Sequence, residues 1–371
     1  MKKQRYQFDL IAQRFIVNRW ETPTGKQVYA EILRCIKASE DIRPVLEHYV
    51  LDHPLNTEPY EYPVYPRDAM QPDAFWVLDP EDMRGISFYQ EDFYATHAFS
   101  KMQLSLASFY ECNLRSAHLG MTRLSYAKFE DCDLRNTVFA HSEGIGTEFV
   151  ASAVCKACFL GADFKDMDCS GADFRGVYFE EARLGHLRVD YLTRFDLTLT
   201  KQWKNRSLPP MQLPDLYRAL RRAYQRADLW HVADRYQFKE RTANRKYIKR
   251  PLILHQRSVR NALIWLMDLS WGLISGYGTK PKRLIASGMS ISVTYAVIYH
   301  LLGGPVGREG AVPTFASSLY FSFTTFATLG YGDISYGPDH PWLRLLSTSE
   351  AWVGAIMIAL FVAVMARKIL R

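Results

Sequence analysis

The strongest constraint on the fold of this chain is a spacing of five residues between large apolar side chains in its middle third. Phe or Leu occupies every fifth position from Phe99 to Phe139, and after Gly144 the same register resumes at Phe149 and continues, mostly with Phe, to Leu184. This spacing matches neither the period of about 3.6 residues of an α-helix nor the two-residue alternation of a strand. It therefore predicts a solenoid built from one short repeated unit.

Small side chains stand two positions before most of these large residues, where they let the chain turn tightly past the filled axis. The register is clearest in GADFK at 161–165 and GADFR at 171–175, and it resembles the pentapeptide-repeat family. The resemblance implies a right-handed quadrilateral β-helix with four pentapeptides per coil, whose coils pair about 4.8 Å apart. Residues 99–189 would then form between four and five coils.

The cysteines do not indicate a disulfide framework or a metal site. The six cysteines have no regular spacing, and CKAC at 155–158 resembles half of a zinc site with no second Cys or His pair to complete it. We interpret Cys112 and Cys132 as compact apolar residues in the small inward positions. Free thiols, no resident metal and no cofactor are therefore expected.

The charge of residues 99–189 is balanced, with 12 Asp and Glu against 10 Lys and Arg. Some pentapeptide-repeat proteins imitate DNA with a densely acidic surface, and this balance argues against such mimicry. We interpret the solenoid as a scaffold or a docking surface for a cytoplasmic protein or ligand.

Helical segments are expected on both sides of the solenoid. Residues 24–50 have a helical spacing of apolar positions, so residues 1–98 are predicted to form a partly helical cap over the open solenoid end. The N-terminal segment lacks the apolar core of a secretory signal peptide, which predicts that it stays in the cytoplasm. Residues 190–260 are predicted to be a connector with two amphipathic helices within 213–248.

The connector is strongly basic, because residues 215–260 carry 13 Lys and Arg against four Asp and Glu. Apolar segments follow at once, so anionic lipid headgroups and the cytoplasmic bias of positive charge explain this run better than nucleic acid does. No nucleic-acid recognition motif accompanies it. We therefore expect contacts with membrane lipids and no nucleic-acid partner.

Two apolar segments near the C-terminus have the length of membrane spans. Residues 284–303 contain no Asp, Glu, Lys or Arg, and residues 345–366 contain only Glu350, near their start. About 20 such residues cross the hydrocarbon core. Basic clusters at 280–283 and 367–371 would lie on the same side after two crossings, which predicts that both termini are cytoplasmic.

Two shorter apolar segments accompany the spans. Residues 262–274 are too few to cross, which predicts an amphipathic interfacial helix within 261–283. Residues 314–329 lie between the spans and predict a re-entrant helix that leads into TLGYGD. Non-helical backbone at membrane depth is tolerated only where protein buries it or water lines it. Residues 284–371 are thus predicted to form one α-helical membrane domain of a multidomain chain, and the resemblance described next implies that it is a pore domain.

The order of span, re-entrant helix, TLGYGD and span over 284–366 resembles the two-transmembrane potassium channel family, whose filter pattern T-x-G-Y-G-D is met at 328–333. A second GYG at 276–278 has no re-entrant helix before it. The resemblance implies a homotetramer whose backbone carbonyls replace the hydration shell of K⁺, the permeant ion. The filter would consist of Thr328, Leu329, Gly330, Tyr331 and Gly332, with K⁺ bound at Thr328, Leu329, Gly330 and Tyr331.

The same resemblance implies roles for residues around the filter. Tyr320 and Phe321 would brace it, and Asp333 would anchor its outer mouth. Thr324 stands where some members carry a carboxylate. Leu329 replaces the commoner Val or Ile without removing a carbonyl, so selectivity is expected to survive.

Four residues of the second span carry functional hypotheses. Glu350 is an intramembrane carboxylate and is expected to form hydrogen bonds behind the filter. Gly354 matches the hinge glycine of the family, or it is a small residue at a helix contact, and both interpretations stay open. Val362 and Ala366, one helical stretch below, are candidates for the cytoplasmic constriction.

Together these features predict a potassium-selective channel of prokaryotic type in the bacterial inner membrane, regulated by its N-terminal domain through residues 261–283. No helix carries Arg at every third position, so voltage sensing is not expected. The alternatives are a non-selective cation channel and a membrane-anchored scaffold that binds a protein partner. An enzyme is not expected, because no nucleophile–base pair, phosphate loop or metal-ligand spacing is present.

Overall fold

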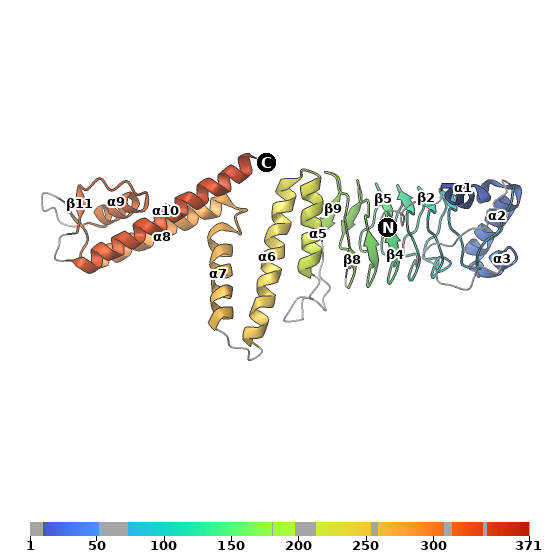
Figure 1. Cartoon of the computed structure of the whole chain (residues 1–371), viewed down its shortest axis with the longest axis horizontal. Coiled ribbons are helices and arrows are strands. Elements are labelled where there is room, and N and C mark those ends of the chain that lie inside the picture. Colours follow the sequence, from blue (N-terminus) through green and yellow to red (C-terminus); the bar gives the residue numbers. More distant parts are fainter. Residues whose placement is uncertain are drawn as a thin grey trace, which may run out of the picture. The chain divides into compact units, whose positions relative to one another are not determined.

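The computed structural model describes residues 10–51, 73–179, 181–196, 213–253, 259–307, 314–336 and 340–370. The chain forms two compact units, Met1–Ala233 and Asp234–Arg371, and each is described by itself (Figure 1). The division falls inside the predicted connector 190–260, within helix α6 (Trp230–Ile253).

Short parallel strands stack along the first unit, as the repeat predicts (Figure 1). Phe109 lies opposite Phe129, and Phe129 opposite Phe149. This separation of four pentapeptides confirms the predicted coil. The central rings are buried and stack along the axis, with centroids 4.9 Å apart for the first pair and 5.1 Å for the second. The described ladders are β1 (Ser87–Tyr89), β2 (Ser108–Tyr110), β3 (Lys128–Glu130) and β5 (Glu148–Val150); β4 (Glu143–Ile145), β6 (Asp163–Lys165) and β8 (Arg183–Leu184); and β7 (Asp173–Arg175) with β9 (Arg194–Asp196).

The solenoid extends beyond the predicted range 99–189 in both directions. Phe88 pairs with Phe109 at one end, and Phe174 pairs with Phe195 at the other. Each of these two coils holds one residue more than four pentapeptides. The insertion shifts the register, so a strict count of five misses the first and last coils.

The small inward positions supply hydrogen bonds as well as room for the turn. The buried hydroxyl of Ser152 donates to the carbonyl oxygen of Phe129, one coil earlier, at 3.0 Å. The thiol of Cys132 lies 3.2 Å from the carbonyl oxygen of Phe109 in the equivalent place. Interior carbonyls that face the axis thereby find a partner.

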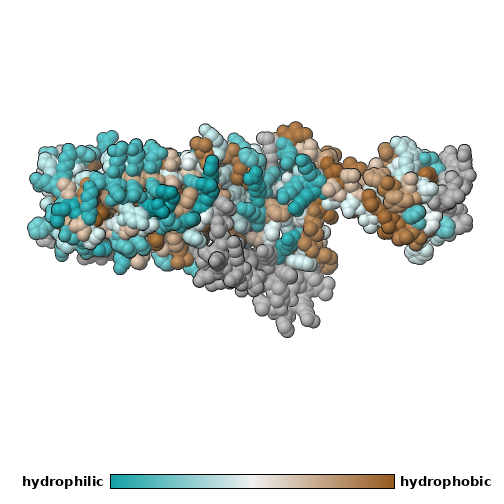
Figure 2. Space-filling model, turned by 180° about the vertical axis from the view of Figure 1, so that it is seen from behind, coloured by the Kyte–Doolittle hydropathy of each residue, from teal (hydrophilic) through white to brown (hydrophobic). Residues whose placement is uncertain are grey.

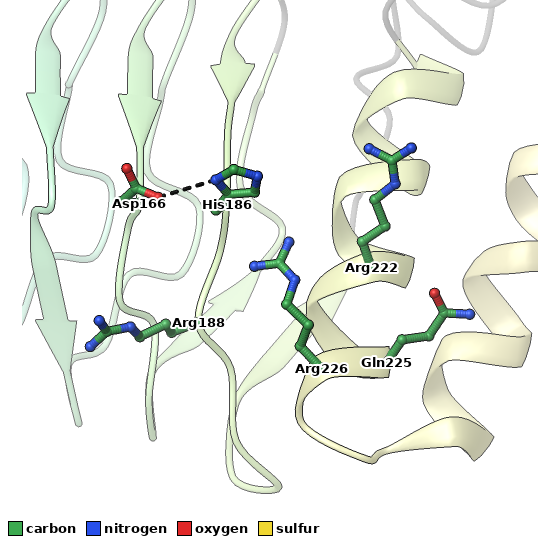
Figure 3. A pocket seen from close by; sticks show the side chains of 6 residues that line it. All are labelled: Asp166, His186, Arg188, Arg222, Gln225 and Arg226. Atoms are coloured by element: carbon green, nitrogen blue, oxygen red, sulfur yellow. Dashed lines mark ion pairs between the residues drawn. The ribbon is translucent and has the colours of Figure 1, made fainter. Parts of the chain in front are cut away.

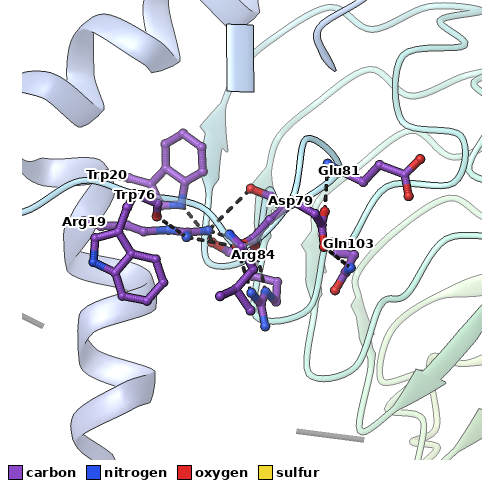
Figure 4. A network of polar contacts seen from close by, with 9 residues as sticks. Arg19, Trp20, Trp76, Asp79, Glu81, Arg84 and Gln103 are labelled. Atoms are coloured by element: carbon purple, nitrogen blue, oxygen red, sulfur yellow. Dashed lines mark hydrogen bonds and ion pairs between the residues drawn. The ribbon is translucent and has the colours of Figure 1, made fainter. Parts of the chain in front are cut away.

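The N-terminal cap consists of α1 (Leu10–Asn18), the 3-10 turn η1 (Arg19–Glu21), α2 (Pro23–Ala38) and α3 (Arg43–Glu47). Arg19 is buried and donates to the two carboxylate oxygens of Asp82 at 3.0 and 3.1 Å, and Arg84 donates to the same carboxylate at 2.7 Å (Figure 4). Burial alone would raise the pKa of Asp82, but the two guanidinium groups outweigh it and hold the pKa well below its ordinary value. The network fixes the cap to the first coil.

Helix α5 (Leu213–Arg226) covers the other end of the solenoid. Its apolar face, which includes Leu216 and Leu220, is buried. The hydroxyl of Tyr224 donates to the carbonyl oxygen of Thr193 at 3.1 Å. Covering the last coil keeps its strand edges from pairing with other chains. Together, α5 and α6 correspond to the two amphipathic helices predicted within 213–248.

The second unit is helical and carries broad hydrophobic surface, in contrast to the hydrophilic solenoid (Figure 2). Among the described residues, α8 and α10 are long and apolar enough to cross a membrane. Both begin earlier than the predicted spans 284–303 and 345–366, because a proline at the first helical position starts each of them. After α6 follow α7 (Val259–Ser275), α8 (Pro281–Leu301), β10 (Val306–Gly307), α9 (Phe315–Phe326), β11 (Ile334–Ser335) and α10 (Pro341–Ile369).

Candidate functional site

Helix α9 occupies the place of the predicted re-entrant helix. It begins with a capping box, in which Thr314 and Ser317 each accept a hydrogen bond from the backbone N–H of the other. Its 12 residues rise about 18 Å, which is less than the hydrocarbon thickness. The helix packs against both α8 and α10 and leads directly into TLGYGD.

Residues 328–332, the predicted filter segment, have left-handed backbone at every second residue. The φ angles of Thr328, Gly330 and Gly332 are 56°, 51° and 72°. Glycine adopts such angles freely, whereas a β-branched residue such as Thr328 is strained there, and strain of this kind concentrates at functional sites. A Cβ atom at either glycine would meet nothing within 4 Å. The backbone conformation, rather than crowding within the chain, therefore requires these glycines.

The backbone N–H groups at the start of the filter point back toward α9. Leu329 and Gly330 both donate to the carbonyl oxygen of Thr324, at 2.9 and 3.3 Å. Within the part of the chain that the structure describes, no hydrogen bond reaches the carbonyl oxygens of residues 328–331. Four consecutive carbonyl groups are thus available to ligands from outside their own chain.

Tyr320 and Phe321, two of the three α9 residues that the sequence singled out, have different surroundings. The hydroxyl of Tyr320 donates to the carboxylate of Asp333 at 2.9 Å, which links α9 to the residue after the filter. Phe321 packs in an aromatic cluster with Tyr299 and Tyr336, with ring centroids 5.2 and 5.6 Å away. The first contact holds the filter end, and the second holds α9 against α8.

Glu350 is fully buried between the three helices. Its carboxylate accepts a hydrogen bond from the hydroxyl of Tyr299 on α8, at 2.7 Å, and another from the hydroxyl of Ser322 on α9. A buried carboxylate requires partners of this kind. Sequence reasoning placed Glu350 behind the filter but missed both partners. The available signal was a pair of serines one turn apart, Ser318 and Ser322, on one face of the helix.

Gly354 lies where α10 meets the end of α9. A Cβ atom at this position would lie 1.9 Å from the carbonyl oxygen of Phe326. Helix α10 runs without interruption from Pro341 to Ile369. Of the two interpretations of Gly354, the described geometry favours the helix contact, because only a residue without a side chain permits this approach.

Val362 and Ala366 lie on a face of α10 that is exposed in the single chain. The opposite face, which includes Met357 and Val364, is buried against the rest of the unit. The exposed face is open to contacts with other subunits or with lipid. A role of Val362 and Ala366 in a constriction stays a prediction.

The C-terminal end of α10 is joined to α6 and to the turn between α7 and α8. Arg367 donates to the carboxylate of Asp234 at 3.4 Å and to the carbonyl oxygen of Gly278 at 2.9 Å. The side chain of Gln237 donates to the carbonyl oxygen of Tyr277 at 3.2 Å. We call these five residues the α6–α10 junction.

The second GYG triplet forms this turn. Gly276, Tyr277 and Gly278 all have left-handed backbone, with φ angles of 58°, 59° and 69°. Tyr277 is buried, and its hydroxyl donates to Asp268 at 3.0 Å. Burial and this hydrogen bond raise the pKa of Tyr277 to about 12. The triplet thus presents backbone carbonyls to α6 and α10, a role that sequence reasoning did not foresee.

The structure also places the CKAC motif. Cys155 and Cys158 are half-buried in the solenoid wall, and the thiol of Cys155 lies 3.6 Å from the carbonyl oxygen of Asp173. Among the described residues, no group of three or more His, Cys, Asp or Glu could hold a metal ion. The motif therefore forms part of the solenoid wall.

Comparisons with known proteins identify both parts of the chain. Residues 289–371 match the family model described as "Ion channel", and residues 103–140 and 157–189 match that of "Pentapeptide repeats". Among curated proteins, none matches the chain.

Solved pentapeptide-repeat structures resemble the solenoid. Trypsin-treated QnrB1, a plasmid-mediated fluoroquinolone resistance protein, is 17% identical with a TM-score of 0.27; the match covers 29% of this chain and 56% of that one. Rfr23, a pentapeptide repeat protein from the cyanobacterium Cyanothece 51142, is 22% identical with a TM-score of 0.17, over 31% and 87% of the two chains. The chain thus spans little more than half the length of QnrB1. Because both TM-scores are low, these likenesses add nothing to what the family match shows.

The fold and the matched families define a membrane protein with an ion-channel domain. More particularly, the chain joins a pentapeptide-repeat solenoid to a helical region that matches the ion-channel family and has two helices long and apolar enough to cross a membrane. Neither matched family is a family of enzymes.

Proposed function

We propose that four copies of this chain form a potassium-selective channel. The observation that carries the proposal is the filter segment, where the carbonyl groups of residues 328–331 have no partner in the described chain and the backbone is left-handed at every second residue. Rings of these carbonyls, with one member from each subunit, would replace the hydration shell of K⁺ as it enters. A single chain supplies one quarter of each ring, so conduction requires the tetramer.

The buried contacts behind the filter support this role. Glu350 connects α8 and α9 to α10 through Tyr299 and Ser322, and the Tyr320–Asp333 hydrogen bond holds the far end of the segment. These contacts would keep the four strands at a constant distance from the pore axis.

The apolar surface of α7 supports a position in the membrane interface. Leu263, Leu266 and Met267 are 55%, 55% and 70% exposed. Lys282 and Arg283, in the first turn of α8, would contact anionic headgroups of the bacterial inner membrane, with both termini in the cytoplasm.

The solenoid would regulate the pore through the α6–α10 junction. Helix α6 continues the connector that follows α5, and Arg367 lies at the end of the helix that carries Val362 and Ala366. Its bonds to Asp234 and Gly278 tie that end to α6 and to the α7–α8 turn. A displacement of α6 would therefore act on the cytoplasmic end of α10, the second span.

Ion flux and subunit number test the proposal. Purified protein in liposomes is expected to admit K⁺ and to exclude Na⁺, and equal fluxes would identify a non-selective cation channel instead. The protein mass in detergent is expected to equal four chains of 42.9 kDa. A mass of one chain without flux would identify a membrane-anchored scaffold.

A further inference from the structure

A cleft lies between the last coils of the solenoid and helix α5 (Figure 3). It encloses about 710 Å³, which lies within the range of about 300–1,000 Å³ that is usual for small-molecule sites. The solenoid supplies one wall and α5 the other. The lining residues are Asp166, His186, Arg188, Arg222, Gln225 and Arg226.

Both walls are held in place by contacts outside the cleft. Helix α5 is fixed by its buried apolar face and by the hydrogen bond from Tyr224 to Thr193. On the solenoid side, strands β6 and β8 pair through their backbones, and the N–H of Arg188 donates to the carbonyl oxygen of Met167, one coil earlier, at 2.8 Å. A ligand would therefore meet a preformed site, which reduces the entropy lost on binding.

The cleft is basic, and all six lining residues are polar. Three of these residues are arginines and only one is an aspartate. Arg222 and Arg226 stand four residues apart on one helix, where like charges repel each other. Among the described residues, neither guanidinium has an ion-pair partner. Two unneutralised guanidinium groups on one wall are suited to phosphate, whose oxygens accept paired N–H bonds from each fork.

We propose that this cleft binds a small soluble anion that carries one or more phosphate groups, held by Arg222 and Arg226 from α5. A lipid would bring acyl chains, for which the lining offers no apolar side chain. Anion binding is measured at equilibrium, so its result does not depend on whether the protein conducts ions.

Calorimetric titration of the purified full-length protein with sodium pyrophosphate tests the proposal at fixed ionic strength. Wild type is expected to bind one pyrophosphate per chain. The double variant R222Q/R226Q is expected to bind at least tenfold more weakly, because it loses two charge-assisted contacts. R218Q is the matched control, since Arg218 lies on the same helix, pairs with Asp215 and does not line the cleft. R188Q is a second control, because the guanidinium of Arg188 points away from α5 and pairs with Asp168 at 3.6 Å (Figure 3); it is expected to bind pyrophosphate almost as wild type does.

The proposal is overturned if wild type does not bind pyrophosphate. It is also overturned if the double variant binds as tightly as R218Q and wild type do, which would place the anion elsewhere on the basic surface. A second titration uses dioctanoyl phosphatidic acid to distinguish a lipid headgroup. If this lipid binds in a way that depends on Arg222 and Arg226 while pyrophosphate does not bind, the proposal of a soluble ligand is also overturned. Arg222 and Arg226 are exposed, so we expect the double variant to keep the thermal midpoint of wild type.

Discussion

Replacing Gly354 by Ala distinguishes a hinge from a packing residue. The added methyl carbon would lie 1.9 Å from the carbonyl oxygen of Phe326, 2.7 Å from its carbonyl carbon and 2.9 Å from its Cα atom. A close carbon–oxygen contact in proteins is about 3.3 Å, so α10 or the end of α9 must move by about 1.4 Å. All three contacted atoms belong to the backbone, which cannot rotate out of the way as a side chain does.

The structure offers a matched control at Gly288. A methyl carbon there would meet the same residue, but at 3.3 Å from the Cζ atom of the Phe326 ring. Overpacking costs about 1–3 kcal/mol, and we expect about 3 kcal/mol for G354A and less than about 1 kcal/mol for G288A. For a unit of this size, that corresponds to a fall of roughly 5–10 °C in the thermal midpoint of G354A.

Size-exclusion chromatography after heating measures the midpoint of the assembled protein, and K⁺ flux is measured on the same samples. The packing account predicts a lower midpoint and a lower flux for G354A, with G288A close to wild type. If G354A keeps the wild-type midpoint while only its flux falls, the packing account is refuted and the hinge interpretation holds.

Three further perturbations follow from the described contacts. E350A leaves the buried hydroxyl of Tyr299 without its acceptor, while Ser322 keeps the carbonyl oxygen of Ser292 at 2.7 Å. Together with the cavity left by the side chain, this is expected to destabilise the protein by about 2–4 kcal/mol, whereas E350Q keeps one acceptor and costs less than about 1.5 kcal/mol in thermal unfolding. R367Q removes the tie between α10 and α6, so K⁺ flux should rise severalfold while K368Q stays at the wild-type rate; equal rates in both variants would contradict the coupling. D82N leaves buried guanidinium groups unpaired and should cost about 3–5 kcal/mol, against less than about 1 kcal/mol for the surface residue in D133N. The folded-state pKa of Asp82 is lowered, so its ionised form stabilises the protein above the ordinary Asp pKa of about 3.9. This stability is lost as the pH falls below that value. If the thermal midpoint of wild type does not drop more steeply than that of D82N in this pH range, the account of the Arg19–Asp82–Arg84 network is contradicted.

The solenoid could be predicted from the sequence because its period leaves few alternatives. A side chain that must fill the axis at every fifth residue specifies the coil, and the pairing of Phe109 with Phe129 and of Phe129 with Phe149 follows from it. The ends were missed where a single inserted residue shifts the register, as between Phe88 and Phe109. Such an insertion keeps the strand pairing but removes the period that a sequence count depends on.

Helix α9 and the left-handed backbone at Gly330 and Gly332 were also within reach of sequence reasoning, because a strained backbone needs glycine at particular positions and the flanking apolar helices need about 20 residues each. The filter role itself stays a prediction. The partners of Glu350 were not, because Tyr299 and Ser322 lie on two other helices and only the packing brings them together. The α6–α10 junction was missed for the same reason. Its bonds join Arg367 to a carboxylate 133 residues away and to a backbone carbonyl, and a carbonyl carries no sequence signal.

The reversal potential of the purified channel in a planar bilayer tests the central claim most directly. With K⁺ on one side partly replaced by Na⁺, a filter made of the carbonyls of residues 328–331 predicts a reversal potential that moves by about 59 mV for each tenfold change in the K⁺ gradient, the value for a single transferred charge. A potential that stays near zero under the same gradient would contradict potassium selectivity.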